Sequence, residues 1–215
     1  MTTAFRTKLN KLYNKLLKMA GIVEDTIQLS VEGLRTLDAE IAKKVIEDDD
    51  IVDDLEYELE VECLSLLATQ QPLAKDLRLV GATLKVITDL ERIADHAVDI
   101  SKITLSLQGQ KLIKPLIDIP RMAEYAVKML HEAVTALINE DLELARKVID
   151  DDDFLDNINK QIFHELLILM IGDPKIISQS MQLLMVSMYL ERIGDHATNV
   201  AEWVYYIVEG KKPKI

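Results

Sequence analysis

An eight-residue segment that occurs twice constrains this chain more than any other feature. LERIADHA at residues 90–97 returns as LERIGDHA at 190–197, with seven of the eight letters identical. A second pair of segments also matches, IAKKVIEDDDIVD at 41–53 and LARKVIDDDDFLD at 144–156. The sequence therefore contains an internal repeat of about one hundred residues, and its two halves should fold alike.

Composition and periodicity indicate that each half is helical. Glycine and proline number only 7 and 5, aromatic residues make up 5% of the chain, and strand-type alternation is absent. Apolar residues recur at steps of three, four or seven, as they do on the packing face of a bundle helix. Six helices are predicted, over about residues 7–37, 38–71, 72–107, 120–138, 142–170 and 174–209.

The predicted fold is all-α, with two tandem three-helix bundles set end to end or side by side. The segment 109–120 contains two of the five prolines and separates a first domain at 1–110 from a second at 111–215. Helices of about 30 residues would each be roughly 45 Å long.

Charge and composition exclude several classes of function. The formal net charge of −12 disfavours nucleic acid as a partner, because binding to phosphate backbones depends on basic residues. No window approaches the roughly 18 uninterrupted apolar residues of a membrane span, and the N-terminal stretch lacks the apolar region of a secretory signal. A single cysteine, Cys63, excludes an internal disulfide and a multi-cysteine zinc site. We expect a cytoplasmic protein.

Each half carries two pairs of acidic residues spaced four apart, which places the members of a pair on one helix face. In the first half, Asp49 falls on the apolar stripe between Val45 and Val52. A carboxylate on a packing face must be paired, neutralised or left partly wet, because its burial alone is expensive. The predicted metal ligands are Asp49, Asp53, Glu91, Asp95, Asp152, Asp156, Glu191 and Asp195.

An all-carboxylate set suits hard or borderline cations. Iron is the first expectation, with manganese, magnesium, calcium and zinc as alternatives. His96 and His196 lie about 100° further around their helices, so we do not predict them as ligands. A solvated acidic face, or neutralisation by lysine and arginine, is the open alternative.

The two halves differ in formal charge. Asp54 and Asp99 of the first half correspond to Asn157 and Asn199 in the second, where Glu202 could compensate. We therefore predict that metal loads the first half before the second.

The chain resembles the PhoU family of phosphate-signalling proteins over nearly its whole length. The resemblance rests on LERI-x-DHA occurring twice and on the acidic pair in each relevant helix. It implies two similar three-helix bundles, and in some members multinuclear iron or other metal clusters at those carboxylates. It also implies a cytosolic negative regulator of the phosphate-starvation response. The implied partners are a sensor histidine kinase and the ATPase of the phosphate ABC transporter, with membrane proximity only through them, and members commonly form homodimers.

The sequence favours a binding and signalling module and not an enzyme. It has no GxxxxGK[ST] loop and no nucleophile elbow. The alternative from another class is a carboxylate-bridged di-metal enzyme or iron-storage protein with a ferritin-like bundle. Such sites use Glu-x-x-His, which does not occur here. A metal-free helical scaffold is the third possibility.

A basic strip on the first predicted helix is the candidate partner surface. It consists of Lys8, Lys11, Lys15 and Lys18, in a stretch of twenty residues without an acid. The strip could be solvated or could pair with acids of the neighbouring helices. The sharper hypothesis is that it meets an acidic or phospholipid surface near the transporter.

Overall fold

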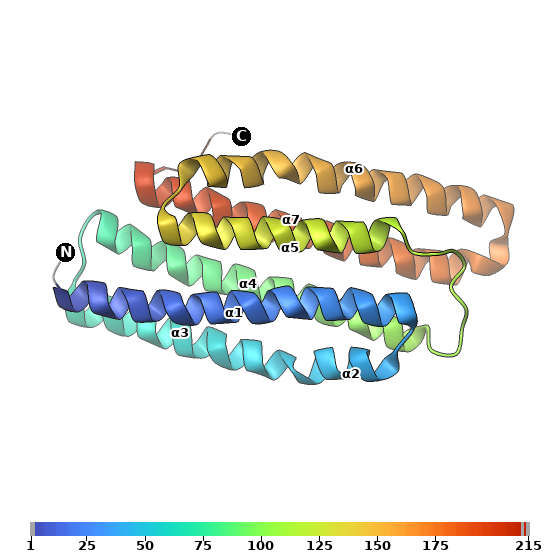
Figure 1. The fold of residues 1–215 in the computed structure, drawn as a ribbon, viewed down its shortest axis with the longest axis horizontal. Helices are drawn as coiled ribbons and strands as arrows, with labels where there is room; N and C mark the ends of the chain where they lie inside the picture. The colour runs from blue at the N-terminus through green and yellow to red at the C-terminus, as the bar shows by residue number, and fades with distance from the viewer. Residues whose placement is uncertain (1–2, 212, 214–215) are drawn as a thin grey trace.

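The computed structural model describes residues 3–211 and 213, and in them the chain is all-α, as predicted (Figure 1). The helices of the first half form one three-helix bundle and those of the second half form another. The elements are α1 (Thr3–Thr36), α2 (Ala39–Glu47), α3 (Asp49–Gln70), α4 (Lys75–Ser106), α5 (Asp118–Asn139), α6 (Leu142–Gly172), the short 3₁₀ helix η1 (Pro174–Ile176) and α7 (Ile177–Glu209). None of these helices combines the length and the apolar character that crossing a membrane requires.

The two bundles lie side by side, and the other predicted arrangement, end to end, is not found. Helix α4 packs along α7 and α1 packs along α5 (Figure 1). The irregular segment 107–117 carries the chain from one bundle to the other at one end of the molecule. Buried apolar side chains from both halves form a single continuous core.

Equivalent helices of the two halves begin with the same cap. The Asp38 carboxylate accepts hydrogen bonds from the backbone N–H groups of Glu40 and Ile41. At the same point of the second half, Asp141 caps α6 in the same way. An aspartate in this position satisfies N–H groups that have no partner inside the helix.

The prediction of one uninterrupted helix over 38–71 was wrong. A turn at Asp48 divides the segment into α2 and α3, whereas the matching segment of the second half is continuous in α6. In α6, Arg146 pairs with Asp150 at 3.0 Å, within the acidic run. The equivalent Lys43 instead pairs with Glu40, away from the run. Like charges on successive turns destabilise a helix unless cations offset them, so the acidic run of the first half is less well supported.

The repeated LERI-x-DHA segments meet where α4 packs on α7. Leu90 and Leu190 are fully buried, and the His196 Nδ1 atom lies 2.9 Å from a carboxylate oxygen of Asp89 across the interface. His96 stacks on Tyr189, with ring centroids 5.6 Å apart. One face of each repeated segment thus holds the two bundles together.

Arg78 adds a second link between the halves. Its guanidinium donates two hydrogen bonds, of 3.1 and 3.0 Å, to the backbone oxygen of Ile207 in the last turn of α7. A cation at a helix C-terminus satisfies a free carbonyl and complements the helix dipole.

Candidate metal centre

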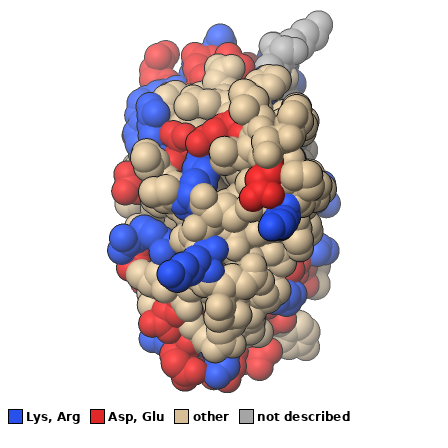
Figure 2. Space-filling view, turned by 90° about the vertical axis from the view of Figure 1, so that its right-hand side faces the viewer, with Lys and Arg blue, Asp and Glu red and all other residues tan. Residues whose placement is uncertain are grey.

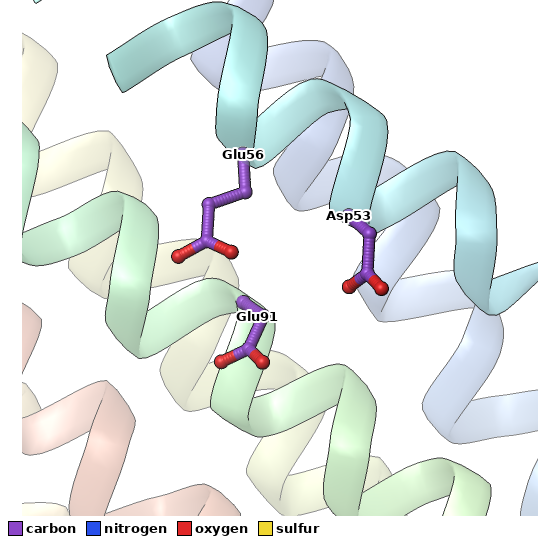
Figure 3. A group of neighbouring side chains, drawn as sticks. All are labelled: Asp53, Glu56 and Glu91. Atoms are coloured by element: carbon purple, nitrogen blue, oxygen red, sulfur yellow. The ribbon is translucent and has the colours of Figure 1, made fainter.

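Three carboxylates from two neighbouring helices converge in the first bundle. Asp53 and Glu56 project from α3 and Glu91 from α4, into the space between the two helices (Figure 3). One oxygen of each lies within 4.8 Å of one oxygen of each of the others. Among residues 3–211 and 213, these three form the one group of histidine, cysteine or acidic side chains that meets this spacing.

Core packing places these acids. Val52 and Leu59 are buried, so Asp53 and Glu56 fall on the flank of α3 that faces α4. On α4, Leu90 is fully buried, and the residue after it is turned about 100° around the helix toward α3.

Glu91 shows that the acidic charge of the cluster is only partly offset. Burial, and after it the charge of Asp95, raise the pKa of its carboxyl group to about 7, while Arg92 acts in the opposite direction. Its Oε2 atom is buried and forms no hydrogen bond, although the Arg92 Nε lies 3.3 Å away. The pKa of Glu56 is raised as well, by burial and by its acidic neighbours. A bound cation would supply positive charge next to the carboxylate of Glu91.

The other two predicted ligands of the first half flank this group and are not members of it. Burial, together with the charges of Asp53 and Asp95, raises the pKa of Asp49 to about 6. Asp95 is paired with Arg92 at 3.1 Å. Asp49 and Asp95 therefore add to the negative potential around the group of three, although they are not members of it.

The second bundle brings its four acids together less tightly. Burial raises the pKa of Asp152 to about 6, with Asp195 and Asp156 contributing, and the pKa values of Glu191 and Asp195 are raised for the same reasons. Asp156 is paired with Lys160 at 3.1 Å. These four carboxylates influence one another electrostatically, but within the described part of the chain they form no group of three at ligand spacing.

The one letter that differs between the repeated segments has a packing cause. A Cβ atom on Gly194 would lie 2.5 Å from Cδ1 of Leu155 and 3.6 Å from Oδ1 of Asp152. Glycine thus lets α6 approach α7 more closely than alanine would allow.

Glu56 is not among the ligands predicted from the sequence. Asp53-x-x-Glu56 is an i, i+3 pair on one face of a helix, whereas the predicted pairs are all spaced four apart. The matching residue of the second half is Asn159, which deepens the predicted charge difference between the two sites.

The basic strip lies on α1 beside α3. Lys15 forms ion pairs with Glu58 at 2.9 Å and with Glu62 at 2.6 Å, and Lys8 donates to the hydroxyl of Thr69 at 3.4 Å. Lys15 thus pairs with acids of the neighbouring helix, while Lys8, Lys11 and Lys18 are exposed.

Comparison with known protein families identifies the family that has this two-bundle architecture. The family model described as "PhoU domain" matches residues 16–104 and again 119–204. The chain belongs to the PhoU domain family. Each match spans one bundle and includes its two acidic pairs, so the duplicated unit corresponds to two copies of the family's domain.

Relatives agree over nearly the full length. A Clostridium acetobutylicum protein named "Phosphate-specific transport system accessory protein PhoU homolog" is 39% identical over 97% of this chain and 95% of its own. An Aquifex aeolicus protein of the same name is 36% identical over 95% and 92%. The crystal structure of PhoU from Pseudomonas aeruginosa superimposes with a TM-score of 0.92 at 34% identity, covering 96% of this chain and all of that one.

Proposed function

We propose that this protein is a negative regulator of the phosphate-starvation response. In this role it links the phosphate ABC transporter to a sensor histidine kinase and limits phosphate uptake when phosphate is plentiful. Family membership over the whole length supports the regulatory role, since full-length relatives carry the name of a phosphate-specific transport accessory protein. The transporter ATPase, the kinase and a second copy of the chain are the proposed partners, and the cytoplasm is the proposed location. No enzymatic step is part of the proposal.

The proposal includes metal binding at the carboxylate clusters. The observation that carries it is the convergence of Asp53, Glu56 and Glu91, together with the buried Oε2 atom of Glu91 that has no hydrogen-bond partner. Burial and acidic neighbours raise the pKa of Glu91. A multivalent cation would offset both effects, and it would join α3 to α4. Iron is the proposed metal, with manganese, magnesium, calcium and zinc as alternatives.

The chemistry of the cluster favours a regulatory metal over a ferritin-like di-metal centre. The three convergent side chains are all carboxylates, whereas di-iron bundle sites also use histidines placed by Glu-x-x-His. His96 stacks on Tyr189 at the α4–α7 interface and does not join the group. Rapid stoichiometric oxidation of added Fe(II), measured as oxygen consumption, would favour the ferritin-like alternative.

A genetic test separates the regulatory role from metal binding. The gene is placed in a bacterium that lacks its own PhoU, and a phosphate-starvation reporter is read in phosphate-rich medium. The wild-type protein should repress the reporter, and a Glu56→Gln/Glu91→Gln variant should repress it less if metal is required. Elemental analysis of both proteins, purified without added metal, shows whether the variant has lost its ion. Failure of the wild-type protein to repress would contradict the regulatory role.

The basic strip is the proposed contact with the transporter side. Changing Lys11 and Lys18 to Glu should weaken co-purification with the transporter ATPase while the helical circular dichroism stays unchanged. Lys85→Glu, an exposed lysine on α4, is the matched control. Equal co-purification of the double variant and the control would remove the strip from the proposal.

A further inference from the structure

An apolar groove of about 410 Å³ runs between α6 and α7. Phe163 lines it from α6, and Met181, Met185 and Met188 line it from α7. All four side chains are large and apolar, yet between 43% and 50% of each is exposed. The groove is therefore surface that folding has left uncovered.

Further exposed apolar residues extend the groove toward the turn between the two helices. Leu167 and Ile171 follow Phe163 at four-residue steps on α6, and Ile177 precedes Met181 by four on α7. Figure 2 looks at the end of the molecule that contains the turn from α6 to α7, and uncharged surface alternates there with acidic and basic side chains. From Ile177 to Met188 the groove follows about 11 residues of helix, or roughly 16 Å.

The internal repeat shows that the fold does not require this apolar surface. When the halves are aligned on their acidic pairs, the positions matching Phe163, Met181, Met185 and Met188 are Glu60, Gly81, Lys85 and Thr88. The first bundle forms the same three-helix arrangement with these small or polar residues. At these positions the second bundle is apolar and the first is not.

One end of the groove is acidic. Asn159 and Met188 line this end, and they lie one helical turn from Asp156 and Glu191 respectively, beside the four-carboxylate cluster of the second bundle. The nearby cations are Lys160, which lines the groove and pairs with Asp156, and Arg192, whose charge lowers the pKa of Glu191 and Asp195. Four carboxylates outnumber the adjacent cations, so this end attracts positive charge.

We propose that the groove binds a short amphipathic helix of a partner protein, with its apolar face in the groove and lysine or arginine at the end that reaches Asp156 and Glu191. A groove about 11 residues long fits three turns of helix. Flexible methionine side chains adapt to the leucine and phenylalanine side chains that such helices present. The acidic end fixes the direction in which the helix lies.

A second copy of this chain is a poorer occupant. The exposed apolar stripe on α3 consists of Tyr57, Val61 and Leu64, and its neighbours in the sequence are Glu58, Glu60 and Glu62. Docking that stripe in the groove would bring acids to the acidic end.

The test uses the intact protein and labelled synthetic peptides of 14 residues. Each peptide has leucine at helical spacing on one face. Two carry a pair of lysines, at the N-terminal or the C-terminal end, and two carry glutamates at the same places. Fluorescence anisotropy measures the dissociation constants in buffer with a chelator, so the result does not depend on the proposed metal site or regulatory role.

One of the two lysine peptides should bind at least tenfold more tightly than its glutamate counterpart. Leu167→Glu and Met185→Glu should each weaken that binding at least tenfold. Leu64 is the residue of the first bundle that matches Leu167, so Leu64→Glu should change the dissociation constant less than twofold. Circular dichroism verifies that all variants are folded.

Three results would overturn the inference. They are equal binding of lysine and glutamate peptides, equal weakening by Leu64→Glu and Leu167→Glu, and no peptide binding at all. Sedimentation of the wild-type protein as a dimer that Met185→Glu converts to a monomer would also overturn it, because the groove would then hold a second copy.

Discussion

Replacing Glu91 with glutamine should stabilise the metal-free protein. Glutamine keeps the shape of the side chain and removes its charge from a cluster in which burial and acidic neighbours raise the pKa of Glu91 to about 7. The usual value is 4.5. At about 1.4 kcal/mol for each pH unit between the two values, ionisation costs the folded state at most about 3.5 kcal/mol.

Screening by water reduces this upper limit. The side chain of Asp95 is 41% exposed, so water screens its repulsion, and we expect roughly half of the limit, about 1.5–2 kcal/mol of stabilisation at pH 8. The lost ion pair with Arg92 needs no separate correction, because Arg92 already lowers the pKa of Glu91 within the value of about 7.

Urea denaturation followed by circular dichroism, in buffer with a chelator, measures the difference. Glu58→Gln, an exposed acid on α3, is the control and should change stability by less than about 0.5 kcal/mol. With a saturating divalent ion the order should reverse, because the ion stabilises the folded wild-type protein by mass action.

The dependence on pH has a definite sign. A carboxyl group whose pKa is raised in the folded state holds its proton longer there, so its effect is absent below about pH 4.5 and full above about pH 7. The metal-free wild-type protein should lose stability as the pH rises through this window, and Glu91→Gln should lose less. If Glu91→Gln is less stable than the wild type in chelator at pH 8, the carboxylate makes favourable contacts and the reasoning fails.

The remaining predictions concern the difference between the halves and the contact between them. When chelator-treated protein is titrated with Mn²⁺ in a calorimeter, the first-half site should fill before the second-half site. Glu91→Gln should abolish the first binding event. Equal loading of both sites would contradict this prediction. Asn159→Glu should strengthen Mn²⁺ binding in the second half about tenfold, or about 1.4 kcal/mol, because it restores the carboxylate that the first half has at this position. Arg78→Ala should lower the free energy of unfolding in urea by about 1.5–3 kcal/mol, since it removes two charged hydrogen bonds to Ile207; a change under 0.5 kcal/mol would show that water replaces them.

Much of the fold was predictable from the sequence, because local rules determine it. The apolar spacing and the scarcity of glycine and proline predict long helices, and the cap at Asp38 marks where the second begins. The break at Asp48 was not predictable in this way. The matching segment of the second half has the same acidic run and stays helical. The two segments differ in the side-chain pairs that they form, Lys43 with Glu40 and Arg146 with Asp150, and such pairs depend on three-dimensional position.

The candidate site was likewise predictable only in part. The i, i+4 spacing of Asp49 with Asp53 and of Glu91 with Asp95 is a property of single helices, so the sequence alone identified the acidic faces. It could not say that Glu56, and not Asp49, joins Asp53 and Glu91 at ligand spacing, because that depends on the rotation of α3 against α4. Core packing fixes this rotation.

By itself, the sequence determined that this protein is a duplicated helical bundle with acids on the packing faces of both halves, since helical periodicity and repetition are written along the chain. Only the tertiary structure decided that the bundles lie side by side through α4 and α7, that three carboxylates meet in the first half, and that an apolar groove is left open in the second. These features arise from contacts between helices. Such contacts depend on how whole side-chain surfaces fit together, which spacing along one helix does not specify.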